Sequence, residues 1–200
     1  MPENKRQIQK NLTKKLLIET AIKQFGETGI LNTKTADIAK AAKVSHGTVF
    51  AHFPKLEDLL TAVIEEFGSR ITQRLHELVD INGSLQDVLQ AHLTGLMEFE
   101  QFYTRLIIER RLLPENLRNT YIMIQSTISF HISLAAEKEI AQNKLRKLPM
   151  HLVYNTWIGL IHYYLTNGDL FSQGDSVLKE YGDELLRHYM SLIINDTRSV

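Results

Sequence analysis

The residues from Ser45 to Thr48 combine side chains and spacing suited to recognition chemistry. Ser45, His46 and Thr48 can each donate and accept hydrogen bonds, and Gly47 lets a partner approach the backbone closely. Ser45 can cap a short helix, so these residues would form its N-terminal end. When a second helix crosses such a helix at a tight turn, this end can reach base edges in the major groove of DNA. The spacing therefore predicts a nucleic-acid contact.

Signatures of catalysis are missing from the sequence. It contains no cysteine, which excludes disulfides, thiol nucleophiles, iron–sulfur clusters and cysteine-bound zinc. It also contains no phosphate-binding loop and no HExxH or GxSxG motif. We therefore expect no enzymatic activity, no cofactor and no metal site. Histidines and carboxylates could still supply an acid and a base, so an all-α enzyme stays as one alternative.

Charge is distributed unevenly along the 200 residues. Residues 1–56 contain ten Lys and Arg against four Asp and Glu, a net charge of +6, so the rest of the neutral chain carries −6. A basic head predicts a polyanionic partner, and a merely solvated basic surface is the alternative. The basic residues ahead of the first expected helix could likewise serve solubility, or contact phosphates or the minor groove.

Hydrophobic spacing predicts helices along the whole chain, so the expected fold class is all-α. Only four prolines and ten glycines interrupt the sequence. Thr35 and Ser45 can cap two short helices, Gly29 can end the helix before them, and Pro54 ends the second short helix. The expected helices cover about residues 12–28, 35–42, 45–53, 56–78, 84–96, 102–112, 115–143, 151–166 and 175–194.

Residues 35–54 fit a helix-turn-helix, in which two short helices cross steeply at a tight turn. Ala39 permits the close approach that such a crossing needs. Other small, aliphatic or aromatic residues fall where the helices must touch, namely Ile38, Ala42, Val44, Val49 and Phe53. The opposite face of the second helix is then free to enter a DNA groove.

This segment resembles the DNA-binding head of the TetR family of transcriptional regulators. The family pattern places small, aliphatic and aromatic residues at fixed spacings and ends in a pair of leucines. The matching positions are Ile38-Ala39, Ala42 to Ser45, Gly47, Phe50, His52-Phe53 and Leu59-Leu60. The resemblance is close over about the first 65 residues, and beyond them it rests on length and helical layout.

Two positions depart from the family pattern. Lys43 stands where the turn usually has glycine, and a left-handed backbone there would cost lysine up to about 1 kcal/mol relative to glycine. Phe50 replaces the usual tyrosine, so a hydroxyl that commonly reaches a DNA phosphate in relatives is missing. The phenyl ring can still pack against the sugars of the DNA backbone.

The resemblance implies which residues contact DNA. His46 and Thr48 would face base edges, and Lys55 would hold a phosphate. Thr35 and Ser45 could instead be only helix caps, and His52 could be a half-buried packing residue. The implied contact set is Thr35, Ser45, His46, Gly47, Thr48, Phe50, His52 and Lys55.

The resemblance also implies two domains. A three-helix DNA-binding domain would cover residues 9–69, and a helical ligand-binding and dimerisation domain would cover 70–200. Because one helix-turn-helix reads few base pairs, we expect a homodimer on a palindromic operator. Apolar stripes at 151–166 and 175–194 predict a four-helix bundle between two copies, with internal core packing as the alternative. The expected interface residues are Leu185, Tyr189 and Ile193.

The middle helices are expected to enclose a pocket for a small-molecule effector of unknown identity. Candidate lining residues are polar or aromatic and lie on the expected inward faces, and for each of them core packing is the alternative. They are His92, Tyr103, Tyr121, Gln125, His131 and Trp157. An effector would act by changing the spacing of the two recognition helices through the helix at 56–78.

Together these features predict a DNA-binding transcriptional regulator of the cytoplasm, acting as a repressor that an effector releases from its operator. Neither a signal peptide nor a membrane span is expected, because the N-terminus is polar and the most apolar stretch, 152–165, is short. A nonspecific architectural DNA-binding protein is the second alternative.

Overall fold

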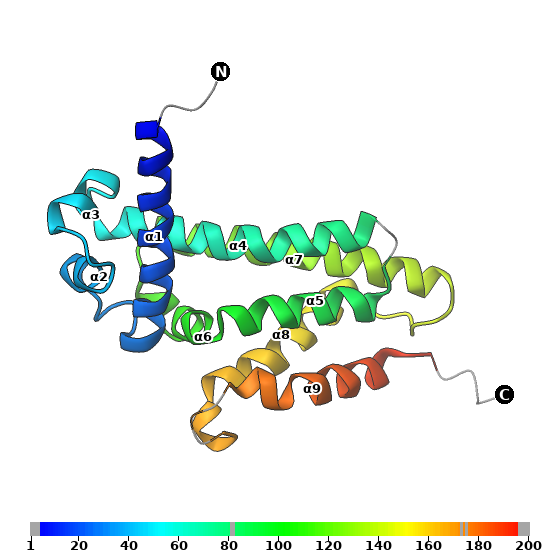
Figure 1. Cartoon of the computed structure of the whole chain (residues 1–200). Helices are drawn as coiled ribbons and strands as arrows, with labels where there is room; N and C mark the ends of the chain where they lie inside the picture. The colour runs from blue at the N-terminus through cyan, green and yellow to red at the C-terminus, as the bar shows by residue number, and fades with distance from the viewer. Residues whose placement is uncertain (1–4, 81–82, 173, 175, 196–200) are drawn as a thin grey trace. The chain divides into compact units, whose positions relative to one another are not determined.

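The chain is helical in the computed structural model, which describes residues 5–80, 83–172, 174 and 176–195 (Figure 1). This confirms the predicted all-α class. Within the described ranges, no helix has the length and apolar character needed to cross a membrane. The α-helices are α1 (Lys5–Thr28), α2 (Thr35–Ala41), α3 (His46–His52), α4 (Leu56–Asp80), α5 (Leu85–Glu98), α6 (Glu100–Glu109), α7 (Glu115–Ala141), α8 (Met150–Thr166) and α9 (Val177–Ile193).

Helix α1 is longer than its sequence pattern predicts. It begins at Lys5 rather than near residue 12, because the preceding stretch of Lys, Arg, Gln and Ile contains no helix breaker. It ends where expected, at Gly29, whose φ of +92° is left-handed. The N–H of Gly29 donates to the carbonyl oxygen of Phe25 at 3.0 Å, which closes the last turn.

The chain forms two compact units. The first contains the described residues of 1–67 together with 101–121, and the second contains those of 68–100 and 122–195. The change of unit after Phe67 falls close to residue 69, the expected end of the DNA-binding domain. Residues 101–121, which the sequence predicts to belong to the C-terminal domain, group with the N-terminal helices instead.

Aromatic contacts explain why residues 101–121 belong to the first unit. The ring of Phe102 in α6 lies 6.4 Å from that of Phe25 in α1 and 5.9 Å from that of Phe67 in α4, measured between centroids. All three rings are buried. The core of the first unit therefore includes the ring of Phe102, which lies 35 residues after the end of the N-terminal part of that unit at Phe67. Helical periodicity does not predict such a contact, because it reports only which face of a helix is apolar.

A carboxylate also ties α6 to the turn that follows α1. Glu109 accepts the N–H of Leu31 at 2.8 Å, and the Nε of Arg105 donates to the carbonyl oxygen of Gly26 at 3.4 Å. These bonds satisfy backbone groups at the end of α1 that its own helix cannot satisfy. The start of the helix-turn-helix is thus held from α6.

The second unit has its core among α5, α8 and α9 (Figure 1). Ser84 caps α5 as predicted, since its hydroxyl accepts the N–H of Asp87 at 3.1 Å. The hydroxyl of Tyr189 in α9 donates to the carbonyl oxygen of Val153 in α8 at 2.5 Å. Gly182 brings α9 against α5, because a Cβ at this position would lie only 2.9 Å from the side chain of Leu93.

Candidate nucleic-acid interface

The turn between α2 and α3 brings the two helices close together. Lys43 has a φ of +55°, so a lysine occupies the left-handed position where the family pattern has glycine. The N–H of Val44 donates to the carbonyl oxygen of Ala39 at 3.0 Å, which closes the turn. Ala39 is buried, and its small side chain allows the crossing. The local geometry is that of a helix-turn-helix.

Ser45 is the N-terminal cap of α3, as predicted. Its Oγ accepts the N–H of Thr48 at 3.1 Å, and the hydroxyl oxygens of the two residues lie 2.8 Å apart. The side chain is nevertheless exposed. The helix therefore holds the hydroxyls of Ser45 and Thr48 in a defined place while the end of α3 stays accessible to a partner.

Thr35 is not the cap of α2, and that prediction is wrong. The cap position is Lys34, whose backbone N–H donates to the Oδ2 of Asp37 at 2.9 Å. Because the Asp37 carboxylate occupies this end of the helix, the Thr35 hydroxyl is available for another bond. It lies 2.9 Å from the Nε2 of His46 and so links the starts of α2 and α3.

His46 is exposed in the first turn of α3. Its ring meets that of Phe50 edge-on, with centroids 4.6 Å apart and an interplanar angle of 89°. The hydrogen bond to Thr35 holds the ring from the other side. An imidazole positioned in this way loses less conformational freedom when it meets a base edge.

The two faces of α3 differ sharply. Val49 is 0% exposed and packs inward, whereas the next residue, Phe50, is 44% exposed. Gly47 and Lys55 are exposed, and Thr48 is partly exposed. The residues implied as DNA contacts therefore lie mostly on the outward face, and the packing residue Val49 lies on the other.

His52 lies at the C-terminal end of α3 and is partly buried, which agrees with the packing alternative for it. Burial is the main reason that its pKa is lowered from 6.5, and the positive charges of Lys10 and Lys14 lower the pKa further. The Nζ of Lys14 also lies 5.9 Å from the centroid of the Phe53 ring. Two cations of α1 thus stand near the end of α3.

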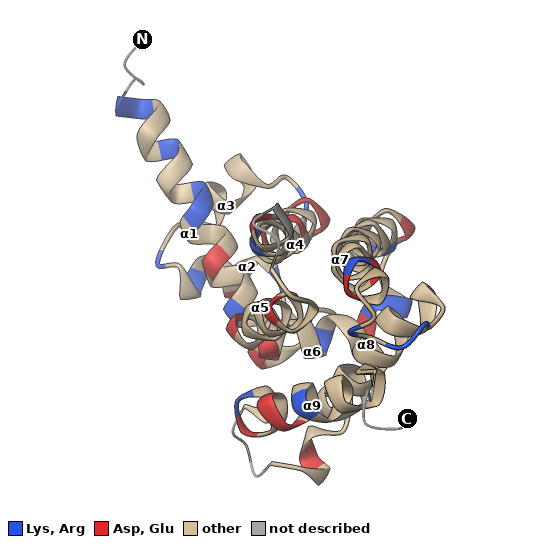
Figure 2. Cartoon of the chain, turned by 90° about the vertical axis from the view of Figure 1, so that its right-hand side faces the viewer, with Lys and Arg blue, Asp and Glu red and all other residues tan. Residues whose placement is uncertain are grey.

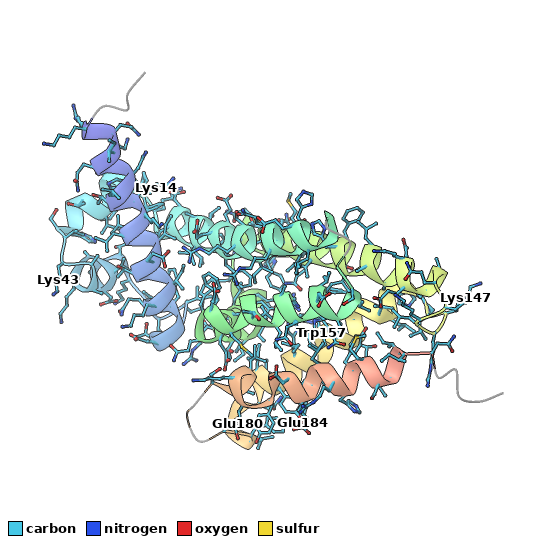
Figure 3. The ribbon with its side chains drawn as sticks, turned by 45° about the vertical axis from the view of Figure 1, so that its right-hand side comes forward. Lys14, Lys43, Lys147, Trp157, Glu180 and Glu184 are labelled. Carbon is cyan, nitrogen blue, oxygen red and sulfur yellow. The ribbon has the colours of Figure 1, made fainter. Side chains whose placement is uncertain are left out.

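Lysine and arginine positions are spread along α1 (Figure 2). Figure 3 labels Lys14 on α1 and Lys43 at the turn between α2 and α3. The sequence prediction named Lys55 as a phosphate contact, offered the basic residues ahead of residue 12, including Lys10, as a phosphate or minor-groove contact, and left Lys14 unassigned. The structure places Lys10 and Lys14 one turn apart on the same helix.

Two of the expected effector residues, Tyr103 and Tyr121, belong to the first unit and are buried. The ring of Tyr103 stacks on Phe67 with centroids 5.1 Å apart, and the Arg110 guanidinium lies 5.2 Å from the Tyr121 ring. Burial raises the pKa of Tyr121, against the opposing effects of a hydrogen bond from Tyr103 and the charge of Arg110. Both tyrosines have packing roles in this unit.

His92 and Trp157 form a buried pair in the second unit. The indole N–H of Trp157 donates to the Nδ1 of His92 at 3.0 Å, so in the neutral ring the proton must be on Nε2. Burial, with a smaller effect of His162, lowers the pKa of His92 to about 3. Among the described residues, the Nε2 of His92 has no hydrogen-bond partner. A neutral N–H donor is therefore left over in an apolar interior.

The other two expected effector residues also lie in the second unit. The side-chain oxygen of Gln125 accepts a hydrogen bond from the hydroxyl of Tyr154. His131 is buried, and its ring centroid lies 5.5 Å from that of His76. The six candidates are thus divided between the two units rather than gathered in one.

The residues expected at a dimer interface are buried within a single chain, so that expectation is corrected. Leu185, Tyr189 and Ile193 are at most 5% exposed, because the apolar face of α9 packs on the core of its own unit. These residues fit the alternative given above, in which the apolar stripe of this helix is internal core. The large apolar side chains that α8 and α9 leave exposed are Leu152, Tyr163 and Leu192.

Residues 17–63 match the family described as bacterial regulatory proteins of the tetR family. The chain is 29% identical over 124 residues to the uncharacterized HTH-type transcriptional regulator YuxN of Bacillus subtilis, covering 59% of this chain and 43% of that protein. It is 34% identical over 99 residues to the probable acrEF/envCD operon repressor of Escherichia coli, covering 48% and 38%. The matched region thus spans less than half the length of these curated relatives.

Solved structures resemble the chain over nearly its whole length. A TetR-family transcriptional regulator from Agrobacterium tumefaciens is 16% identical and has a TM-score of 0.77, covering 92% of this chain and 99% of that one. The regulator FadR from Bacillus subtilis, solved in complex with stearoyl-CoA, is 18% identical with a TM-score of 0.70, covering 88% and 97%. At these identities the likeness establishes the fold.

Proposed function

Because the chain belongs to the tetR family of bacterial regulatory proteins, we propose that it is a transcriptional repressor that binds a palindromic operator as a homodimer. The family consists of transcriptional regulators rather than enzymes. The observation that carries the proposal is the exposed polar end of α3, held by the buried Val49 and by the left-handed turn at Lys43. The repressor acts in the cytoplasm, where it meets the operator.

In this proposal the residues of α3 divide the work of recognition. His46 and Thr48 read base edges in the major groove, since they lie in the first turn of the helix. Lys55 and the hydroxyl of Ser45 hold phosphates, and Phe50 packs on the sugars. The link from Thr35 to His46 supports this arrangement because it orders the imidazole before DNA arrives.

The homodimer forms through the exposed apolar residues of α8 and α9. Leu152 and Tyr163 lie three helical turns apart on α8, and Gly159 between them has open space around it. A two-fold axis near Gly159 would let the α8 helices of two copies approach closely, with Leu192 of α9 at the edge. Two copies are needed because one seven-residue recognition helix reads too few base pairs for a useful specificity.

A small-molecule effector binds the second unit in this proposal. The buried N–H donor on the Nε2 of His92 supports it, because such a donor is costly to leave unsatisfied and fits a ligand that carries an acceptor oxygen. Since His92 stays neutral above a pH of about 3, its Nε2–H would donate to a ligand oxygen without contributing a charge. The complex of FadR with stearoyl-CoA shows that the same fold can hold a small molecule.

Footprinting on DNA that flanks the chain's own gene tests the proposal. At near-physiological salt, the protein should protect a discrete, symmetric site, and light scattering should report a dimer. The variant His46→Ala/Thr48→Ala should lose this protection, whereas Gln86→Ala, an exposed change on α5, should keep it. Uniform protection along the fragment would favour the architectural alternative, and a monomer without sequence preference would contradict the proposal.

A further inference from the structure

The first three turns of α1 form a basic, exposed segment. From residue 5 to residue 16 every side chain except Thr13 is classed as exposed, and the stretch contains five Lys and Arg and no Asp or Glu. Figure 2 shows the blue positions that they occupy along this helix. The first buried residue of α1 is Leu17, and Lys14 is the residue of this segment that contacts a core ring of the helix-turn-helix, Phe53. The segment therefore has room for a partner.

Two of these cations share one face of the helix and lie beside α3. Lys10 and Lys14 are one helical turn apart. Lys14 lies over the Phe53 ring, and both charges are felt by His52 at the end of α3. Lys14 also lines a cleft of about 380 Å³ together with the carboxylates of Glu19 and Glu66. Lys10 and Lys14 thus place two positive charges near the C-terminal end of α3.

The dimensions of the DNA groove indicate what this charge would meet. A seven-residue helix spans roughly 10 Å, and the major groove is about 12 Å wide. When the N-terminal end of α3 reaches the base edges, its C-terminal end stands near a wall of the groove, which is a row of phosphates. Cations beside His52 and Phe53 would then face that row.

We infer that Lys10 and Lys14 form a phosphate clamp, a second DNA contact made by α1 alongside the contacts of the helix-turn-helix. The inference rests on the proposed function for the orientation of α3 on DNA. The clamp binds any duplex, because phosphates carry no sequence information. It raises the affinity and the salt dependence of binding without changing which operator is preferred.

An anionic membrane is the other polyanion that a basic helix can meet, and the arrangement of α1 favours DNA. Ile8, Leu12 and Leu16 form an exposed aliphatic stripe along the same segment, with exposed fractions of 44%, 57% and 46%. At 3.6 residues per turn, Lys10 and Lys14 each lie about 160° around the helix from Leu12. A helix lying in a membrane would need its cations at the borders of the stripe. Lys5 and Lys15 lie within about 60° of Leu12, but Lys10 and Lys14 lie opposite the stripe, toward α3, where a membrane that held the stripe would not meet them.

The test compares Lys10→Gln/Lys14→Gln with Lys144→Gln/Lys147→Gln, which removes the same charge from exposed positions outside the first unit (Figure 3). Duplex affinity is measured by fluorescence anisotropy between 50 and 200 mM salt, on the protected operator and on a random-sequence duplex. The clamp variant should bind both duplexes about tenfold more weakly or worse, and the slope of log affinity against log salt should fall by about two for each bound protomer. The control variant should match wild type, and Lys10→Arg/Lys14→Arg should restore binding.

Three outcomes separate the inference from the proposed function. If the clamp variant and the control variant behave alike on both duplexes, the clamp is refuted. The clamp is also refuted if the variant loses binding only to vesicles of phosphatidylcholine and phosphatidylglycerol. If wild type protects no discrete operator but the clamp variant still loses affinity for the random duplex, the repressor proposal fails and the clamp stands. Circular dichroism and thermal melting check that both variants remain folded.

Discussion

The two units of this chain use polar side chains in opposite ways. Around α2 and α3, polar groups stay accessible and are hydrogen-bonded to partners near them in sequence: Ser45 to Thr48, 3 residues away, and Thr35 to His46, 11 residues away. In the second unit, His92 and Gln125 are bonded to partners 65 and 29 residues away, and His92 is completely buried. Exposed groups held by local bonds remain available to an external partner. Buried groups contribute to the stability of the fold, so substituting them should chiefly change the free energy of unfolding.

The largest expected effect concerns the buried His92. Since burial lowers its folded pKa to about 3, the unfolded chain, with a pKa near 6.5, takes up the proton first as pH falls. The associated stability is present above pH 6.5 and is lost progressively between 6.5 and 3. At pH 4.5 the loss from this one residue should be about 3 kcal/mol. Urea denaturation at pH 7.5 and 4.5, followed by the fluorescence of Trp157, the only tryptophan, measures it.

A matched pair of variants isolates the contribution of His92. In His92→Gln the side-chain oxygen can still accept from Trp157 but does not titrate, so the loss between the two pH values should shrink by most of that amount. The exposed His151→Gln should leave the loss unchanged. Equal pH dependence in all three proteins would show that the buried imidazole is not the group being titrated.

The contrast should also hold within α3, between its two faces. Val49→Ala removes buried methyl groups and should destabilise the first unit by about 2 kcal/mol. The neighbouring Thr48→Ala should change the free energy of unfolding by less than about 0.5 kcal/mol and yet weaken operator binding about tenfold. Thermal melts and anisotropy on the same samples compare the two. If Thr48→Ala lost stability and kept its affinity, the assignment of the outward face to DNA would be wrong.

A smaller effect is expected for the cap of α3. Ser45→Ala removes the acceptor for the N–H of Thr48 and should cost about 1 kcal/mol, whereas Ser45→Asp keeps an acceptor and should cost little. Chemical denaturation measures both changes. The aspartate should still impair operator binding, because it places a negative charge next to phosphates. Stability losses of equal size in both variants would argue against a capping role.

The smallest expected effect is a gain in stability. Lys43 has a left-handed backbone, so Lys43→Gly should stabilise the chain by up to about 1 kcal/mol. Lys40→Gly removes the same charge from the last turn of α2, where the backbone is helical, and should destabilise by up to about 1 kcal/mol. Changes of the same sign in the two melting temperatures would show that the charge, rather than the backbone, controls the result.

Local spacing was enough to predict the region around α3. The cap at Ser45, the end of α3 before Pro54 and the inward position of Val49 follow from contacts within a few residues. Thr35 was misjudged because two neighbouring positions could cap α2, and the carboxylate of Asp37 favours the earlier one. The overall class was predictable because helical periodicity persists along the chain.

Contacts between distant parts of the sequence were not predictable in the same way. An apolar stripe on α9 looks the same whether it faces its own chain or a second copy, so Leu185 and Tyr189 were placed at an interface although they are core residues. The pairing of His92 with Trp157 likewise joins two helices whose registers are set only on packing. The length of α1 was missed because its first turns are exposed: the aliphatic residues Ile8, Leu12 and Leu16 face solvent, and the first buried residue of the helix is Leu17.

The aromatic contact between α1, α4 and α6 has a consequence for how this protein can be recombined. Phe102 completes a core whose other rings, Phe25 and Phe67, lie more than 30 residues earlier in the chain. A DNA-reading module cut out at residue 67 would leave these rings open to water, and grafting it onto a foreign regulator would require residues 101–121 as well. Exchange of operator specificity among relatives should therefore proceed by substitutions on the outer side of α3 rather than by shuffling a continuous gene fragment.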